Sequence, residues 1–96
     1  MSDIQNLDTF ETLIDIIAKL RSPEGCPWDR KQTHASLREY LLEECYEALD
    51  ALDEGDMDKL RDELGDILLQ IMLHAQIGSE NGEFTIGDVI QNLNEK

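Results

Sequence analysis

Residues 37–77 decide the fold, and they read LREYLLEECYEALDALDEGDMDKLRDELGDILLQIMLHAQI. On both sides of Gly55, leucine, isoleucine and alanine recur at intervals of three and four residues. This is the pattern of two amphipathic helices, the first ended by a glycine. No segment of the sequence shows the apolar and polar alternation of a half-buried β-strand. The sequence therefore predicts an all-α fold, a bundle of about four helices around a central antiparallel helix hairpin.

Four carboxylates lie at matching heights on the two arms of this predicted hairpin. Glu47 and Glu63 are each eight residues from Gly55, and Glu44 and Asp66 are each eleven residues from it. Since both helices rise about 1.5 Å per residue, the two pairs should face each other at the border of the core. Like charges gathered there raise one another's pKa and destabilise the fold unless a cation joins them. The pattern therefore favours a divalent metal site.

The chemistry of these ligands indicates which metal the site would hold. Carboxylates without an imidazole or thiolate at ligand spacing favour a hard cation, Mg²⁺ with Mn²⁺ as a substitute. The Glu-x-x-His spacing of di-iron bundles is absent, which makes iron the weaker alternative. A solvated acidic helix face is the alternative without a metal. Gln70 and His74 continue the border of the second arm, either with their polar atoms satisfied at the core edge or orienting a carboxylate ligand.

The remaining helices are expected on both sides of the hairpin. A first helix is predicted from about Thr9 to Arg21, after a flexible tail over residues 1–8. The Pro- and Gly-containing residues 22–33 should form a loop, in which Trp28 either stacks on a nucleobase or plugs the top of the core. The other expected boundaries are Thr33 and Gly55 for the second helix, Asp56 and Asn81 for the third, and a capping-box variant at residues 85–88 for the fourth.

Composition bounds the class of protein. The 96 residues suffice for one small domain over residues 1–96, and their 22 acidic against eight basic residues give a net charge of −14. Such a surface repels nucleic-acid backbones and anionic membranes, so neither is expected as a partner. Two cysteines offer no disulfide framework, and no apolar run approaches the length of a membrane span. These features predict a cytoplasmic protein.

Two further motifs carry a resemblance to a known family. The segment EECYE at residues 43–47, followed after fifteen residues by ELGD at residues 63–66, resembles the E-E-x-x-E…E-x-x-D signature of the MazG-type all-α nucleoside triphosphate pyrophosphohydrolases. The preceding CPWD at residues 26–29, with QTH at residues 32–34, is similar to the loop that leads into that signature. The resemblance covers most of the chain, from about Leu20 to His74.

The resemblance implies hydrolysis of a nucleoside triphosphate between its α and β phosphates, often to remove non-canonical nucleotides. It assigns Glu44, Glu47, Glu63 and Asp66 as Mg²⁺ ligands. Glu43 would hold a second ion or help Glu47 to deprotonate the attacking water. Candidates to touch the substrate are Trp28, Arg30, Lys31, Arg38 and Lys96.

Family members typically build the site between subunits, so a homodimer or homotetramer is expected. A helical wheel supports this, because Leu69, Met72 and Leu73 lie outside the main apolar arc and would otherwise face water. The arcs themselves comprise Leu37, Leu41, Cys45, Ala48, Leu49 and Leu52 on the first arm, and Leu60, Leu64, Ile67, Leu68, Ile71 and Ala75 on the second.

The sequence departs from the family pattern at its end. MazG-like domains usually continue past the position of Lys96 into a basic stretch that contains arginine and histidine, and this stretch is missing here. The alternatives are a domain truncated at its C-terminus, a less active domain, or one that depends on a neighbouring subunit. Two rival functions remain open. One is a non-catalytic helical interaction or oligomerisation domain, and the other is a related dUTP, dCTP or phosphoribosyl-ATP pyrophosphohydrolase.

Overall fold

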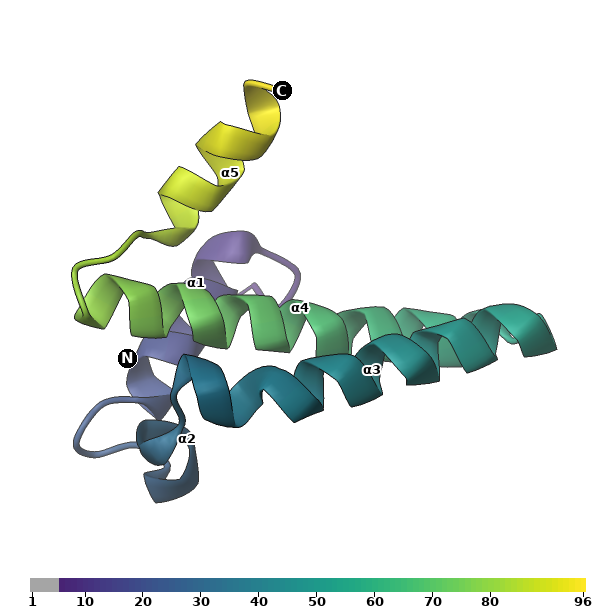
Figure 1. Cartoon of the computed structure of the whole chain (residues 1–96), viewed down its shortest axis with the longest axis horizontal. Coiled ribbons are helices and arrows are strands. Elements are labelled where there is room, and N and C mark those ends of the chain that lie inside the picture. Colours follow the sequence, from purple (N-terminus) through teal and green to yellow (C-terminus); the bar gives the residue numbers. More distant parts are fainter. Residues whose placement is uncertain (1–5) are drawn as a thin grey trace. The chain divides into compact units, whose positions relative to one another are not determined.

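The computed structural model describes residues 6–96, most of which are helical. Residues 6–96 contain no β-strand, which confirms the predicted all-α class. The helices are α1 (Phe10–Leu20), α2 (Pro27–Lys31), α3 (His34–Glu54), α4 (Met57–Glu80) and α5 (Ile86–Asn94) (Figure 1).

The described residues form two compact units. The first ends at Gln32 and contains α1 and α2, and the second, Thr33–Lys96, contains α3, α4 and α5. A single domain over residues 1–96 stays a prediction. The predicted flexible tail over residues 1–8 falls largely on residues 1–5, which lie outside the described part of the chain.

In the first unit, α1 has the boundaries that the sequence predicts, but the loop prediction was wrong over Pro27–Lys31. The Thr9 hydroxyl caps α1 by accepting the N–H of Thr12 at 3.3 Å. Pro27 begins α2, where its fixed φ suits a first helical turn. The Arg21 guanidinium donates to the carbonyl oxygens of Asp29 and Gln32, at 2.5 and 3.1 Å, and so satisfies the end of this short helix.

The hairpin in the second unit begins and ends where the sequence predicts. Thr33 and Ser36 form a capping box at the start of α3. Gly55 ends α3 with φ at 69°, a left-handed conformation that glycine adopts without steric cost. The Asp56 side chain then accepts the N–H of Lys59 at 3.1 Å and caps α4. Helices α3 and α4 run antiparallel, side by side (Figure 1).

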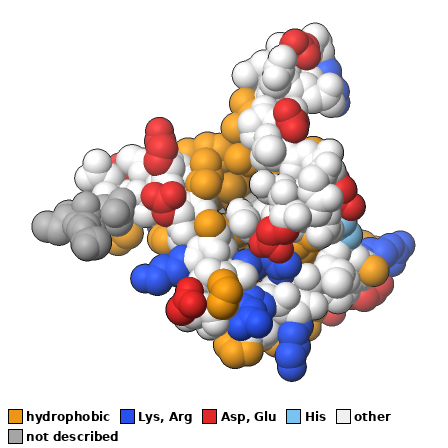
Figure 2. Space-filling view, turned by 90° about the vertical axis from the view of Figure 1, so that its left-hand side faces the viewer, with side chains coloured by type: hydrophobic (Ala, Val, Ile, Leu, Met, Phe, Trp, Pro, Cys, Tyr) orange, Lys and Arg blue, Asp and Glu red, His pale blue; other side chains and the backbone are white. Residues whose placement is uncertain are grey.

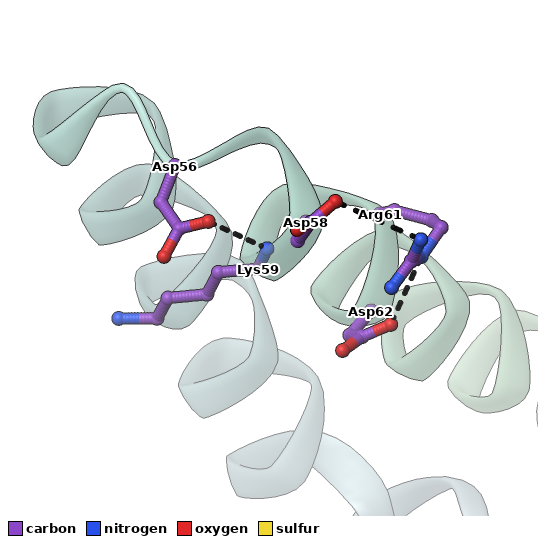
Figure 3. Close-up of polar contacts among 5 residues, drawn as sticks. All are labelled: Asp56, Asp58, Lys59, Arg61 and Asp62. Atoms are coloured by element: carbon purple, nitrogen blue, oxygen red, sulfur yellow. Dashed lines mark hydrogen bonds and ion pairs between the residues drawn. The ribbon is translucent and has the colours of Figure 1, made fainter.

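Charged side chains surround the tip of the hairpin (Figure 3). The guanidinium of Arg61 lies 3.8 Å from Asp58 and 3.2 Å from Asp62, and all three side chains are largely exposed. Exposed ion pairs of this kind contribute about 0–1 kcal/mol each. The Asp56 cap matters more, since removing such a cap typically costs about 1 kcal/mol.

The buried residues of the hairpin differ from the predicted apolar arcs. The expectation that Met72 and Leu73 face water was wrong, because they are 2% and 1% exposed, whereas Leu69 is 36% exposed. At roughly 100° per residue, the buried positions at the C-terminal end of α4 lie all around the helix rather than on one face. Conversely, half of the predicted arc residues are exposed: Cys45, Leu49, Leu52, Leu64, Leu68 and Ile71.

The turn between α4 and α5 is closely packed. A Cβ atom on Gly78 would lie 3.0 Å from the ring of Phe84, so this position accepts only glycine without a shift. The predicted capping box at the start of α5 is present. Thr85 accepts the N–H of Asp88 at 3.1 Å, and Asp88 accepts the N–H of Thr85 at 2.9 Å.

Hydrophobic side chains also lie at the surface, where Figure 2 shows them among acidic ones on the face in view. On α5, Leu93 is 65% exposed, and Val89 and Ile90 are 39% and 38% exposed. None of the described helices is both long enough and apolar enough to cross a lipid bilayer.

Candidate metal centre

Three carboxylates come together on the hairpin. One oxygen each of Glu44, Glu63 and Asp66 lies within 4.8 Å of the other two. Glu44 comes from α3, and Glu63 and Asp66 lie one turn apart on α4. Glu44 and Glu63 are partly buried, and Asp66 is exposed. The structure thus brings together three of the four carboxylates that the sequence pairs across Gly55.

The electrostatics of this group are those of crowded like charges. Burial raises the pKa of Glu44 above the ordinary 4.5, and Asp66, Glu63 and Glu47 raise this pKa further. Burial also raises the pKa of Glu63, with Asp66 and Glu47 adding to the effect. Side-chain hydrogen bonds with Asp66 contribute to both shifts, and a bond between two carboxyl groups requires a proton on one of them. Glu47 is therefore close enough to act on the group although it lies outside the three-oxygen cluster.

Glu43, Glu44, Tyr46 and Glu47 line a depression of about 410 Å³ on α3. This volume lies in the range of small-molecule sites. Sequence reasoning missed Tyr46, which is 60% exposed and places an aromatic ring beside the acids. Its position in the EECYE segment, between the candidate ligands Glu44 and Glu47, was the available signal.

The donor set fits a hard divalent cation. Mg²⁺ binds carboxylate oxygens at about 2.1 Å, so oxygens on one ion lie roughly 3–4 Å apart. The cluster in which all three oxygens lie within 4.8 Å is already close to that spacing. Small rotations of the side chains would bring the three oxygens onto one ion. All of the donors are oxygen, which matches the preference of Mg²⁺ and Mn²⁺.

A family model described as the MazG nucleotide pyrophosphohydrolase domain matches residues 32–96. The chain belongs to this family. The resemblance drawn from residues 43–47 and 63–66 is thereby confirmed. The match includes α3, α4 and α5, so the MazG domain contains all three clustered carboxylates.

Curated relatives of this MazG domain agree with the assignment. The nucleoside triphosphate pyrophosphohydrolase/pyrophosphatase MazG of Thermotoga maritima is 63% identical over 87 residues, which are 91% of this chain and 34% of the relative. The nucleoside triphosphate pyrophosphohydrolase of Escherichia coli K12 is 44% identical over 91 residues, covering 94% and 35%. That of Mycobacterium tuberculosis is 50% identical over 91 residues, covering 90% and 27%. The chain thus spans about a third of the length of these relatives.

The predicted substrate contacts lie in both units, and those of the first unit precede the residues that the MazG model matches. Trp28, Arg30 and Lys31 belong to α2 in the first unit. Trp28 is 47% exposed, and both interpretations of it, stacking on a nucleobase and plugging the core, stay predictions. In the second unit, Arg38 pairs with Glu39 at 3.0 Å. Lys96 lines a separate depression of about 590 Å³ with Phe84, Asp88, Val89, Asn92 and Leu93.

Sequence reasoning also missed Lys59, a base one turn before Glu63. Its ammonium group lies 3.5 Å from Glu54. Burial lowers the pKa of Lys59, but Glu54, Glu47 and Asp50 outweigh that effect and raise it. Lys59 in turn lowers the pKa of Glu63. The spacing of four residues from Glu63 was the signal, since residues i and i+4 are neighbours on a helix surface.

Gln70 and His74 do not have equivalent surroundings in the MazG domain. Gln70 is 6% exposed, and its side-chain oxygen has no hydrogen-bond partner among the described residues. His74 bonds to His34, with their Nδ1 atoms 2.8 Å apart, as the interpretation of a satisfied histidine at the core edge expects. That either residue orients a carboxylate ligand stays a prediction.

Proposed function

We propose that this chain carries the catalytic site of a Mg²⁺-dependent nucleoside triphosphate pyrophosphohydrolase. The reaction is attack of water on a nucleoside triphosphate to give a nucleoside monophosphate and pyrophosphate, with non-canonical nucleotides as candidate substrates. The observation that carries the proposal is the cluster of three carboxylate oxygens within 4.8 Å, in a chain that belongs to the MazG family. Relatives that bear the name nucleoside triphosphate pyrophosphohydrolase support the choice of reaction.

Each carboxylate has a distinct part in this proposal. Glu44, Glu63 and Asp66 would hold Mg²⁺, and Glu47 would complete the ligand set or accept the proton of the attacking water. Glu43 lines the same depression as Glu44 and Glu47 and would assist that proton transfer. Bound Mg²⁺ would neutralise charge on the phosphate oxygens and acidify a coordinated water.

Substrate attraction is the main electrostatic problem for this site. A triphosphate brings about four negative charges to a chain whose net charge is −14. Lys59 is the base whose electrostatic influence reaches Glu63 and Glu47, so we assign it a phosphate contact beside the metal. Trp28, Arg30, Lys31, Arg38 and Lys96 remain further candidates to touch the nucleotide.

A pyrophosphate-release assay tests the proposed function. The chain is incubated with a panel of canonical and non-canonical nucleoside triphosphates, including dUTP and dCTP, and with phosphoribosyl-ATP, in Mg²⁺ or in EDTA. We expect Mg²⁺-dependent release of pyrophosphate, abolished by Glu47→Gln and unaffected by Glu39→Gln. Glu39 is a matched control because it is an exposed glutamate on the same helix, α3, and its carboxylate pairs with Arg38 instead of joining the clustered carboxylates. A correctly folded chain without turnover on any substrate would favour a non-catalytic helical module.

We further propose that the second copy of a homodimer, or of a homotetramer, covers the exposed apolar side of the hairpin. Leu49, Leu52 and Leu64 are 52%, 53% and 53% exposed on adjacent arms, an unusual number of surface leucines for an isolated hairpin. Light scattering at micromolar concentration should give at least a dimer, and a stable monomer would contradict the proposal.

We propose a cytoplasmic location, because the free thiols of Cys26 and Cys45 and a nucleotide substrate both fit that compartment.

A further inference from the structure

Two histidines and one glutamate connect the start of α3 with the turn that follows α4. The Nδ1 atoms of His34 and His74 are 2.8 Å apart, and Nε2 of His34 lies 2.8 Å from a carboxylate oxygen of Glu83. The two imidazole rings are parallel within 6°, with centroids 5.0 Å apart. The ring of Phe84 stacks on His34 at 6.1 Å. Residues far apart in the sequence thus form one continuous contact.

The two hydrogen bonds of this contact limit which ring nitrogens can carry a proton. Because a carboxylate only accepts, His34 must carry a proton on Nε2 to bond Glu83. The two facing Nδ1 atoms need one proton between them, supplied either by neutral His74 or by cationic His34. Both arrangements keep every hydrogen bond. A proton added to the second arrangement makes both rings cationic, which places two N–H groups against each other and breaks the bond between the rings.

Charged groups on the neighbouring elements make contacts of their own. On α5, Asp88 is engaged as the cap of Thr85. On α3, Arg38 pairs with Glu39, and on α4, Glu80 accepts from Gln76 at 3.2 Å. The carboxylate of Glu83 contacts Nε2 of His34 directly, at 2.8 Å.

We propose that His34, His74 and Glu83 form an acid-sensitive latch that ties the α4–α5 turn to the start of α3 and opens when both imidazoles become protonated. Opening releases Glu83 and, with it, the stacked ring of Phe84. Phe84 and Lys96 line the same depression beside α5, so the latch controls how firmly that depression is held. This role does not depend on the proposed hydrolase activity.

The electrostatic surroundings of His74 agree with this arrangement. Burial lowers its pKa below the ordinary 6.5, and the neighbouring His34 lowers it further. The latched form therefore binds fewer protons than the open form once the pH falls below 6.5. Acid should thus favour the open form, and the effect should be complete below the lowered pKa of His74.

Amide hydrogen exchange tests the latch on the whole chain in metal-free buffer. The reporters are the N–H groups of Glu83 and Phe84, which bond the carbonyl of Gly78. After correction for intrinsic exchange rates, their protection should fall about tenfold between about pH 7.5 and about pH 5.5, since the open form takes up one extra proton. His74→Gln keeps a side chain that can hydrogen-bond but does not titrate, so its protection should change little with pH. An equal acid response in both proteins would overturn the proposal.

The imidazole nitrogens give a second measurement that needs no variant. Nitrogen-15 chemical shifts of the unmodified chain at about pH 7.5 should show a proton on one Nδ1 of the pair, because the bond between the rings requires it. Both rings in the tautomer that carries its proton on Nε2 alone would show that the histidines do not bond. That result would also overturn the latch, whatever the exchange data show.

Discussion

Glu44→Gln should have opposite effects on stability with and without Mg²⁺. In metal-free buffer the Glu44 carboxylate has two carboxylate neighbours within 4.8 Å. At that separation, two unit charges in a water-like dielectric repel by about 0.9 kcal/mol. Physiological salt, with a Debye length of about 8 Å, reduces the sum over two neighbours to about 1 kcal/mol. Removing the charge should therefore stabilise the metal-free chain by about 1 kcal/mol, or roughly 4–8 °C in Tm.

With Mg²⁺ the order should reverse. A ligand at one hundred times its Kd stabilises the protein that binds it by about 2.7 kcal/mol. The variant keeps only two of the three clustered carboxylates, so it should gain a small part of this. The wild-type chain should then be the more stable one by about 1–2 kcal/mol, which is the metal-linked gain less the repulsion between the carboxylates.

Thermal unfolding followed by far-UV circular dichroism can measure both signs. The two buffers are matched in ionic strength with NaCl, because Mg²⁺ would otherwise also act by screening. The measurement is made near pH 8, since the raised pKa of Glu44 leaves it partly protonated at lower pH. Glu39→Gln makes the same charge change elsewhere on α3 and should show no reversal. A variant that is less stable than wild type in both buffers would refute the three-carboxylate site.

Three other expected outcomes concern the pH dependence of stability, the packing of Gly78 and the role of Lys59. In metal-free buffer, Glu44 and Glu63 have raised pKa values and so bind more protons in the folded chain than in the unfolded chain. Their contribution to stability is therefore lost as the pH rises above 4.5 through the raised pKa values. Urea unfolding should show that the free energy of unfolding falls as the pH rises. The measurement uses His74→Gln, because the lowered pKa of His74 changes stability with pH in the opposite direction. Mg²⁺ should remove this pH dependence, and a free energy of unfolding that does not change with pH in metal-free buffer would contradict the prediction. Gly78→Ala should destabilise the chain by about 1–3 kcal/mol, because the added Cβ atom would press against the ring of Phe84. The control Gly65→Ala, whose Cβ atom would meet nothing within 4 Å, should stabilise the chain by up to about 1 kcal/mol. Equal urea midpoints for the two variants would refute the close packing of Gly78. Lys59→Met removes the positive charge and should raise KM for the nucleotide more than it lowers kcat. Lys59→Arg keeps the charge and should behave like the wild type. An unchanged KM in Lys59→Met would show that Lys59 does not contact the phosphates.

The sequence predicts those features that depend on local chemistry. Thr33, Gly55 and Asp56 set helix boundaries through contacts within a few residues of themselves, and all three act as predicted. The heights of the acids follow from the helical rise and one turn, so the meeting of Glu44 with Asp66 could also be predicted.

Features that depend on distant partners could not be read from local patterns. Helix α2 is completed by the guanidinium of Arg21, which lies eight residues from Asp29 along the chain. His34 and His74 are forty residues apart, and neither lies in a motif that requires the other. The burial of Met72 and Leu73 likewise reflects packing that helical periodicity does not reveal.

The rotation of α3 and α4 about their own axes explains why acids lie at the contact between these helices while several leucines lie at the surface. Ala48 and Ala51 on α3 are 7% and 0% exposed near the tip, and such small side chains permit close approach of a neighbouring helix. On α4 the partly buried Glu63 lies roughly 60° around the helix from Leu60, beside the predicted arc rather than within it. The contact between α3 and α4 is therefore rotated from the leucines toward the acids. The same rotation that brings Glu44 to Glu63 also leaves Leu49, Leu52 and Leu64 exposed, so the proposed metal site and the proposed covering subunit have one geometric cause.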